Sequence, residues 1–334
     1  MPKINGPINV LRLEGQIFNI KKVIYIYFDH HYDVNKQTKC DDFLADDVVV
    51  YLNKEFAKID DKYIDFFMET SFDQRENLIK NIKYKERYID EINKFFMKNI
   101  IIKNNKNIGT PFKKIRFHYA DIRNEFRYII YDEFKTSITE LFNKIKSKII
   151  NNATYSDYKN SIDIIRKMLD KLKHIIKAED NNLINKIKNK YVHPEIKNKI
   201  IPLIDNLFDY IEIIKNNLIN IQVLSDAEEQ YLEIIQLYAW LMDIYFLRRF
   251  LDKDYITNAI IYCGVGHSIR YIIFLIKSFD FKITHASYSS KPLPLVNQII
   301  KESTDEINHN DISKFFINNY IQCIDITSFP ENFS

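Results

Sequence analysis

The residues best suited to chemistry in this sequence follow short apolar runs. Asp29, His30 and His31 come directly after the apolar run at 23–28. Asp29 and His31 are two positions apart, so in an extended chain their side chains share one side and His30 takes the other. A carboxylate beside an imidazole can hold a metal ion, or it can move protons as a general acid–base pair. A hydrogen-bonded turn uses the same residue types, and both interpretations stay open.

A turn with two glycines carries a second group of polar residues. The pentapeptide GVGHS begins at Gly264 and follows another apolar run. Gly264 and Gly266 allow a sharp turn from strand to helix and leave N–H groups at the helix start, where an anion is favoured. We therefore expect these glycines and Ser268 to bind a substrate or anion, with His267 at the mouth of the site. A dinucleotide fingerprint would place glycine at Ile269, and a plain strand-to-helix turn is the alternative.

Two more polar residues stand at or just beyond the ends of apolar runs. Glu69 directly follows the run at 63–68 and could act as a general base or a metal ligand. An exposed loop carboxylate, or a pair with Arg75, is the alternative. Arg123 lies beyond another run and could hold an anionic substrate group, or it could pair with Asp121.

The apolar runs predict the strands that would position these residues. Several are apolar almost throughout, which is typical of strands covered on both faces. Helical patterns separate them, and this alternation predicts an α/β fold with a mostly parallel central sheet and flanking helices. The carboxyl ends of parallel strands meet in one crevice, so the polar residues there should converge. The expected strands are 23–28, 63–68, 115–119, 259–263 and 281–285, with a sixth at 8–13.

The pattern changes between residues 125 and 254. Strand-like runs disappear there, and long helical patterns replace them. The sequence SDAE at 225–228 is typical of a helix N-terminus, and a wide apolar and aromatic face follows it. We therefore predict an α/β core domain formed by 1–124 and 255–334, and a large all-helical insertion subdomain at 125–254.

Composition and charge limit the possible classes of function. The chain has 334 residues, of which 46% are hydrophobic and 28% charged, so it can bury a sizeable core. The net charge is only +3, and no clear nucleic-acid signal is present. No segment is long and apolar enough to be a transmembrane segment, and the N-terminus lacks the apolar core of a signal peptide. We expect a cytoplasmic protein, whose oligomeric state the sequence leaves open.

The three cysteines are Cys40, Cys263 and Cys323. Their number is odd and none forms a CxxC pair, which predicts reduced thiols rather than a disulfide framework or a cysteine-only zinc site. Cys263 lies beside the glycine turn without an evident base in sequence, so a cysteine nucleophile is a further alternative.

The motifs resemble those of a known group of hydrolases. The strand-x-Asp-x-His pattern that ends at His31, the strand-terminal Glu69 and the late Gly264-x-x-His267 are similar to the TIKI/TraB and erythromycin-esterase-like group. That group carries two Gly-x-x-His motifs and a glutamate, and some members are metal-dependent hydrolases. In this chain Phe28 stands where the first motif has glycine.

A closer resemblance covers most of the chain. The segments 28–42 and 115–123 are similar to uncharacterised proteins of large DNA viruses of protists. This resemblance implies the host cytoplasm or the virion as the location, and it implies no known reaction.

Two functional hypotheses follow. The first is a hydrolase of unknown small-molecule or peptide substrates with Asp29, His31, Glu69 and His267 as catalytic residues. In a metal-assisted form, His31, Glu69 and His267 would hold a divalent zinc, manganese or iron ion that lowers the pKa of a bound water; otherwise no cofactor is expected. The second is a non-catalytic viral structural or host-interaction protein that keeps an enzyme-like α/β fold.

Overall fold

The computed structural model describes most of the chain. The described residues are 3–32, 40–70, 87–98, 101–103, 106–109, 111–122, 188–218, 224–303, 309–318 and 321–334, with the short stretches 143, 159–160, 162–167, 169–170 and 173. The chain divides into two compact units, one formed by 1–121 with 253–334 and the other by 122–252. The all-helical character of 125–254 stays a prediction, because much of 123–187 lies outside the described residues.

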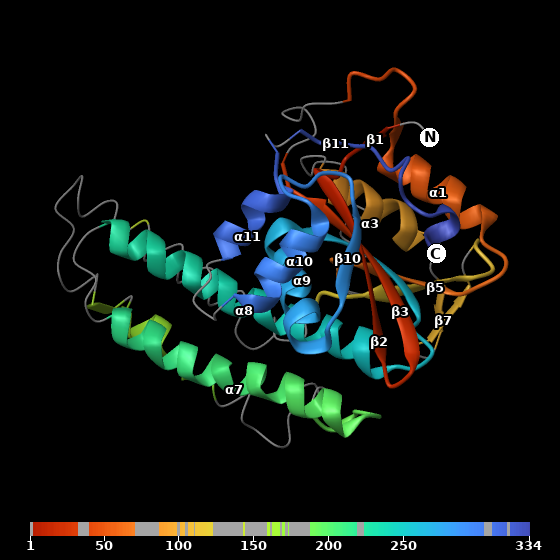
Figure 1. Ribbon diagram of the computed structural model, residues 1–334. Helices are drawn as coiled ribbons and strands as arrows, with labels where there is room; N and C mark the ends of the chain where they lie inside the picture. Colours follow the sequence, from red (N-terminus) through yellow and green to blue (C-terminus); the bar gives the residue numbers. More distant parts are fainter. Residues whose placement is uncertain are drawn as a thin grey trace. The chain divides into compact units, whose positions relative to one another are not determined.

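A six-stranded mixed sheet forms the centre of the first unit, within the residues described (Figure 1). The prediction of an α/β fold is confirmed. Four neighbouring strands are parallel, whereas β2 is antiparallel to β3, and β10 is antiparallel to β2. The sheet is therefore mixed and only partly parallel. In order across the sheet, the strands are β10 (Lys282–Ala286), β2 (Asn9–Ile17), β3 (Ile20–Asp29), β9 (Asn258–Gly264), β5 (Ile64–Met68) and β8 (Ile115–Tyr119).

A tight hairpin explains the antiparallel pair. Ile17 pairs with Ile20, so the connection between β2 and β3 has only Phe18 and Asn19. Both residues have positive φ, 46° and 68°, as two-residue hairpin turns of type I′ require. A parallel connection would need a crossover of a dozen or more residues, and this link has no room for one.

Helices cover both faces of the sheet. Tyr25 and Tyr27 of β3 belong to an apolar cluster with Phe56 of α1 (Val48–Lys58) and Phe96 of α3 (Tyr88–Lys98). On the other face lie α9 (Val265–Phe279), α10 (Leu293–Glu302) and α11 (His309–Phe316), as Figure 1 shows. Phe28 of β3 contacts Phe316 there, with ring centroids 6.4 Å apart. Burial on two sides is the reason that the strand sequences are apolar almost throughout.

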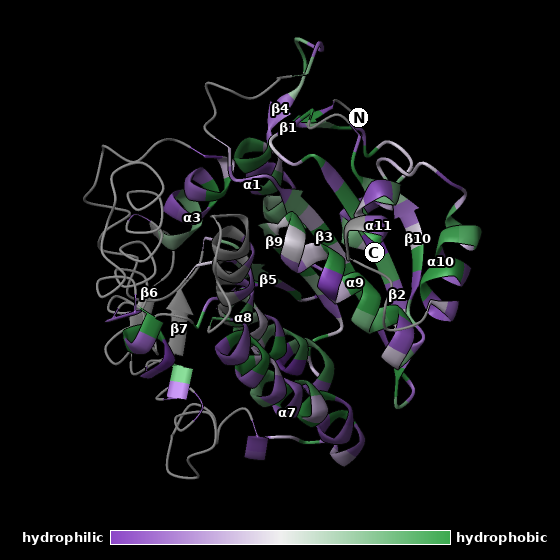
Figure 2. Cartoon of the chain, turned by 90° about the vertical axis from the view of Figure 1, so that its left-hand side faces the viewer, coloured by the Kyte–Doolittle hydropathy of each residue, from purple (hydrophilic) through white to green (hydrophobic). Residues whose placement is uncertain are grey.

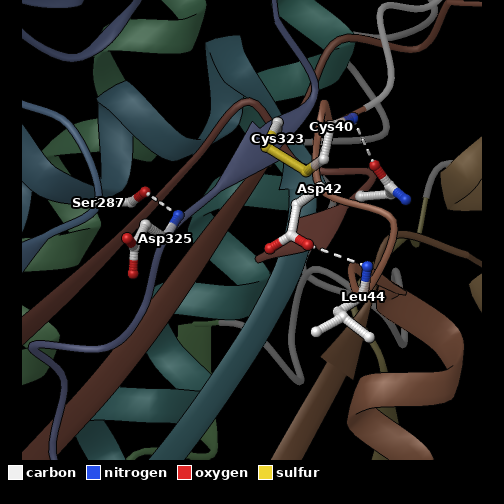
Figure 3. The surroundings of a disulfide bond; sticks show 7 residues. Cys40, Asp42, Leu44, Ser287, Cys323 and Asp325 are labelled. Atoms are coloured by element: carbon white, nitrogen blue, oxygen red, sulfur yellow. Dashed lines mark hydrogen bonds between the residues drawn. A yellow bond between two sulfur atoms is a disulfide. The ribbon is translucent and has the colours of Figure 1, made fainter. Parts of the chain in front are cut away.

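A small three-stranded sheet joins parts of the chain that are far apart in sequence. It consists of β1 (Ile4–Asn5), flanked by β11 (Cys323–Ile324) and β4 (Asp46–Asp47). A disulfide links Cys40 to Cys323 beside it, with the Cα atoms 5.0 Å apart (Figure 3). The expectation of reduced thiols is therefore wrong for these two residues, while Cys263 is a buried thiol outside this disulfide. Their sequence separation of 283 gave no indication of this proximity.

The remaining described elements are a hairpin and the helices of the second unit. The hairpin consists of β6 (Ile101–Lys103) and β7 (Lys106–Gly109), and a short 3-10 helix, η5, spans Glu331–Phe333. In the second unit α7 (Pro194–Asn217) contacts α8 (Leu224–Asp252), and both carry hydrophobic and hydrophilic residues along their length (Figure 2). Tyr210 stacks on Trp240 between these two helices, at 5.3 Å. Among the described helices, none combines the length and apolar character that a membrane span requires.

Candidate functional site

Three neighbouring parallel strands bring together the four residues predicted to be catalytic. Asp29 ends β3 and lies in register with Gly264, which ends β9, and Glu69 directly follows β5 on the other side of β9. His31 Nε2 lies 3.6 Å from Glu69 Oε2, and His267 Nε2 lies 3.4 Å from Glu69 Oε1. Asp29, His31, Glu69 and His267 thus form one group, which we call the strand-end cluster.

Asp29 lies beside the ring of His31. The Asp29 side chain is buried, and its Oδ1 accepts the His31 backbone N–H at 2.5 Å and lies 3.0 Å from His31 Nδ1. His31 has a φ of 55°, and this left-handed conformation is uncommon in non-glycine residues. The Tyr262 hydroxyl donates to Asp29 Oδ2 at 2.8 Å. The structure therefore contains both alternatives for this segment, a hydrogen-bonded turn and a carboxylate–imidazole pair.

The environment of His31 favours its protonated form. Burial lowers the pKa of His31, but its contact with Asp29 and the negative charges of Glu69 and Asp29 raise it more. The charge of Arg87, which precedes α3, opposes them only in part, so the net pKa shift is upward. Arg87 and Tyr262 were not predicted as site residues, because one lies at a helix start and the other inside an apolar strand.

The glycine turn holds an anion that belongs to the protein itself. Gly264 is the N-cap residue of α9, and its backbone N–H donates to Glu69 Oε2 at 2.7 Å. A helix N-terminus favours negative charge, so α9 stabilises the Glu69 carboxylate where we expected a substrate or free anion. The Nδ2–H group of Asn93 in α3 donates to the Glu69 main-chain carbonyl oxygen at 3.3 Å.

The two glycines of the turn have different surroundings. A Cβ atom at Gly264 would lie 2.5 Å from His31 Nε2 and 3.2 Å from its Cδ2. The first distance is too short for any non-bonded contact between heavy atoms. Gly264 therefore makes room for the His31 ring. A Cβ atom at Gly266 would meet only Arg270 Nη1, at 3.9 Å. The chain thus needs glycine at 264 for a close side-chain approach, whereas position 266 has space for a methyl group.

The hydrogen-bond partners of His267 indicate its tautomer. Arg270 Nη2 lies 3.2 Å from His267 Nδ1, and a guanidinium can only donate, so Nδ1 is the acceptor. The proton of the neutral ring is then on Nε2, which faces Glu69 Oε1. His267 therefore presents an N–H group to the shared carboxylate.

Ser268, which we expected to bind substrate or an anion, forms its hydrogen bonds inside the glycine turn. The side chain of Ser268 is fully buried, and its hydroxyl donates to the Gly264 carbonyl at 3.1 Å and lies 3.3 Å from Cys263 Sγ. These contacts lie within the first turn of α9 and at the end of β9, so they support the turn rather than expose a hydroxyl to ligand. Arg123 lies outside the described residues.

His118 belongs to a separate group of charges. Its Nε2 lies 2.7 Å from Oδ1 of the buried Asp65, and Arg116 binds both oxygens of that carboxylate at 2.8 and 2.6 Å. Asp65 stands near the amino end of β5, whereas the strand-end cluster lies at the carboxyl ends. These contacts account for the buried charge of Asp65 without involving the cluster.

The predicted metal ligands His31, Glu69 and His267 lie next to one another, and their role in metal binding stays a prediction. Among the described residues, no three or more His, Cys, Asp or Glu side chains are arranged to hold a metal ion. His31 and His267 each direct Nε2 to a different oxygen of Glu69, at 3.6 and 3.4 Å, and one of these oxygens already accepts the Gly264 N–H.

Comparison with known proteins places the chain in a family that has no assigned reaction. "Uncharacterized protein R706" of Acanthamoeba polyphaga mimivirus is 32% identical over 415 residues, which cover 99% of this chain and 96% of that protein. "Uncharacterized protein R161" of the same virus is 33% identical over 437 residues, with 99% and 98% covered. No solved structure matches.

The expected similarity to proteins of large DNA viruses is confirmed by these relatives, and none of the matches links the chain to the TIKI/TraB or erythromycin-esterase-like group. A family model described as "Family of unknown function (DUF5847)" matches residues 2–207 and 143–334. The two matches together span nearly the whole sequence, and the chain therefore belongs to the DUF5847 family.

Proposed function

We propose that this protein is a hydrolase whose strand-end cluster performs acid–base chemistry. One observation carries the proposal: the Glu69 carboxylate lies between the imidazoles of His31 and His267, with Asp29 behind His31. The cluster lies at the carboxyl ends of adjacent parallel strands, the edge where α/β proteins bind ligands, and titratable groups with shifted pKa values gather at functional sites.

His31 is the group that a substrate can reach. Its side chain is 34% exposed, whereas the side chains of Glu69 and His267 are each 8% exposed. In the neutral ring, with Nδ1 protonated toward Asp29, Nε2 can take a proton from water. The resulting hydroxide adds to the substrate carbon. The protonated His31 then returns the proton to the leaving group as the bond to that group breaks.

The other members of the cluster would support this proton transfer. Asp29 holds the His31 tautomer and stabilises the imidazolium, the role of the carboxylate in other carboxylate–histidine catalytic pairs. Glu69 would add a second negative charge near the imidazolium; the Gly264 N–H donates to that carboxylate, and His267 Nε2 lies 3.4 Å from it. The substrate class would be an ester or amide of a small molecule or peptide.

A substrate panel with matched variants tests the proposal. We expect the wild-type protein to hydrolyse at least one chromogenic ester or amide, and His31→Ala and Glu69→Gln to lower kcat by roughly 10²-fold or more. His285→Ala is the control, because His285 contacts Thr284 and Phe329 rather than the cluster. Folding of each variant is checked by circular dichroism.

The outcomes separate this proposal from its alternatives. Absence of turnover on the whole panel, or equal turnover in Glu69→Gln and wild type, would refute it and favour a non-catalytic protein. The metal-assisted form is tested by measuring the metal content of the purified protein and its activity after treatment with a chelator. Near-stoichiometric metal that is lost in both His31→Ala and His267→Ala, together with activity that a chelator abolishes, would replace the metal-free mechanism.

A further inference from the structure

The loop after Cys40 presents two large apolar side chains to solvent. Phe43 is 93% exposed and Leu44 is 64% exposed, the highest values among the large hydrophobic residues described. Most exposed apolar residues of a folded protein are scattered singly, whereas these two are adjacent on one turn. We call Phe43 and Leu44 the apolar tip.

Hydrogen bonds fix the turn that carries the apolar tip. Asp42 Oδ1 accepts the Leu44 N–H at 2.9 Å (Figure 3), and the Asp42 carbonyl accepts the Ala45 N–H at 3.0 Å. A side chain that bonds the backbone two residues later is a common way to stabilise a turn. The tip is therefore presented in a defined conformation.

Both ends of the loop are attached to the small sheet. At one end, the disulfide joins Cys40 to Cys323, and the Cys40 N–H donates to Asn5 Oδ1 at 2.7 Å (Figure 3). At the other end, Asp46 pairs with Ile4, and its N–H donates to the Lys3 carbonyl at 3.1 Å. A loop fixed in this way has little conformational entropy left to lose when a partner binds, which favours affinity.

The charges around the apolar tip restrict the kind of partner. The segment 40–47 contains four aspartates and no lysine or arginine. Within this segment Asp46 forms an ion pair with Lys54 at 2.7 Å, while Asp41 and Asp47 are exposed. An acidic border repels nucleic acid and anionic lipid, and it attracts a basic protein surface.

We propose that the apolar tip is a docking surface for a partner protein that offers an apolar pocket bordered by lysine and arginine. Phe43 would fill the pocket, since a buried aromatic side chain at the centre of an interface carries a large share of the binding energy. The aspartates would pair with the basic border, speed association and set the orientation. This surface is independent of the strand-end cluster and of hydrolysis.

A random-peptide library is the probe for this surface. The full-length oxidised chain is immobilised, and the variant Phe43→Ser/Leu44→Ser in solution removes peptides that bind elsewhere. We expect the enriched peptides to combine aromatic or aliphatic residues with lysine or arginine. Phe43→Ser should weaken their binding by about tenfold or more, and high salt should weaken it further because the flanking charges are exposed.

Leu295→Ser is the matched control, because Leu295 is 43% exposed on α10 and lies outside the loop. It should leave peptide binding unchanged, and equal melting temperatures establish that all variants fold. Failure to recover tip-dependent peptides, or recovery of peptides without basic residues, would overturn the proposal. Two other results would also overturn the proposal. If the wild type sediments as a dimer and Phe43→Ser abolishes the dimer, the surface serves a second copy of the chain. If the wild type binds phosphatidylcholine vesicles and Phe43→Ser abolishes this binding, the surface serves a membrane.

Discussion

Replacing Gly264 by alanine tests the geometry of the strand-end cluster most directly. The added Cβ would lie 2.5 Å from His31 Nε2, whereas non-bonded heavy atoms prefer about 3.5–4.0 Å. The ring must therefore move by about 1 Å or more. The backbone at 264 has φ −60° and ψ 151°, which alanine adopts without strain, so the effect comes from this contact alone.

The two expected magnitudes differ. A misplacement of about 1 Å in a catalytic group can lower the rate by about 10²-fold. The stability loss should be smaller, about 1 kcal/mol, the low end for overpacking, because the partly exposed His31 ring can rotate toward solvent. Gly266→Ala is the control, since its Cβ meets only Arg270 Nη1 at 3.9 Å, and alanine inside a helix is about 0.5–1 kcal/mol more favourable than glycine.

Turnover, thermal melting and a crystal structure of Gly264→Ala provide the assay. Activity should fall in Gly264→Ala and persist in Gly266→Ala. In a His31→Ala background, Gly264→Ala should no longer destabilise the protein, because the ring that it would strike is gone. If Gly264→Ala keeps wild-type activity with the His31 ring in place, or destabilises the His31→Ala background equally, the assigned role of Gly264 is refuted.

Three further predictions concern charge, a buried hydrogen bond and the disulfide. The raised pKa of His31 means that its protonated form stabilises the fold fully below about pH 6.5 and that this contribution is lost as pH rises through the folded-state pKa. The difference in unfolding free energy between wild type and His31→Gln should therefore shrink from pH 6 to pH 8, and a growing difference would contradict the assignment. Tyr262→Phe removes the donor to buried Asp29 Oδ2 and should cost about 1–3 kcal/mol in denaturant unfolding, whereas no measurable loss would show that this bond is dispensable. Replacing Cys40 and Cys323 by serine should lower the melting temperature, because closing a loop this long contributes up to about 5 kcal/mol of chain entropy to stability. Reductant should lower the melting temperature of the wild type by the same amount and leave that of the variant unchanged.

The positions of the strands could be predicted because burial on both faces leaves an almost continuous apolar run. The run at 23–28 lies within β3, and the run at 115–119 coincides with β8. Strand direction was less accessible, since an apolar run is the same in either direction. The signal for the antiparallel pair was the short turn at Phe18 and Asn19, whose positive φ angles appear only in the structure.

The membership of the cluster could be predicted, but its contacts could not. Asp29, Glu69 and His267 were found because polar residues at the carboxyl ends of parallel strands converge. The approach of Gly264 to His31 depends on the register of β3 against β9, which single-sequence patterns do not specify. The contact of the Tyr262 hydroxyl with Asp29 could not be predicted either, because a tyrosine inside a buried strand has the sequence pattern of any core residue.

The pairing of β3 with β9 has a consequence for the order of folding. The β2–β3 hairpin is local and can form early, whereas β9 is synthesised more than 200 residues after β3. At about 5–20 residues per second, β3 waits on the order of ten seconds or more for this partner. During that time the second edge of β3 lacks the strand that it pairs with in the folded sheet. The candidate site is therefore assembled late in synthesis, when Gly264 and His267 reach Asp29, His31 and Glu69 from the other end of the chain.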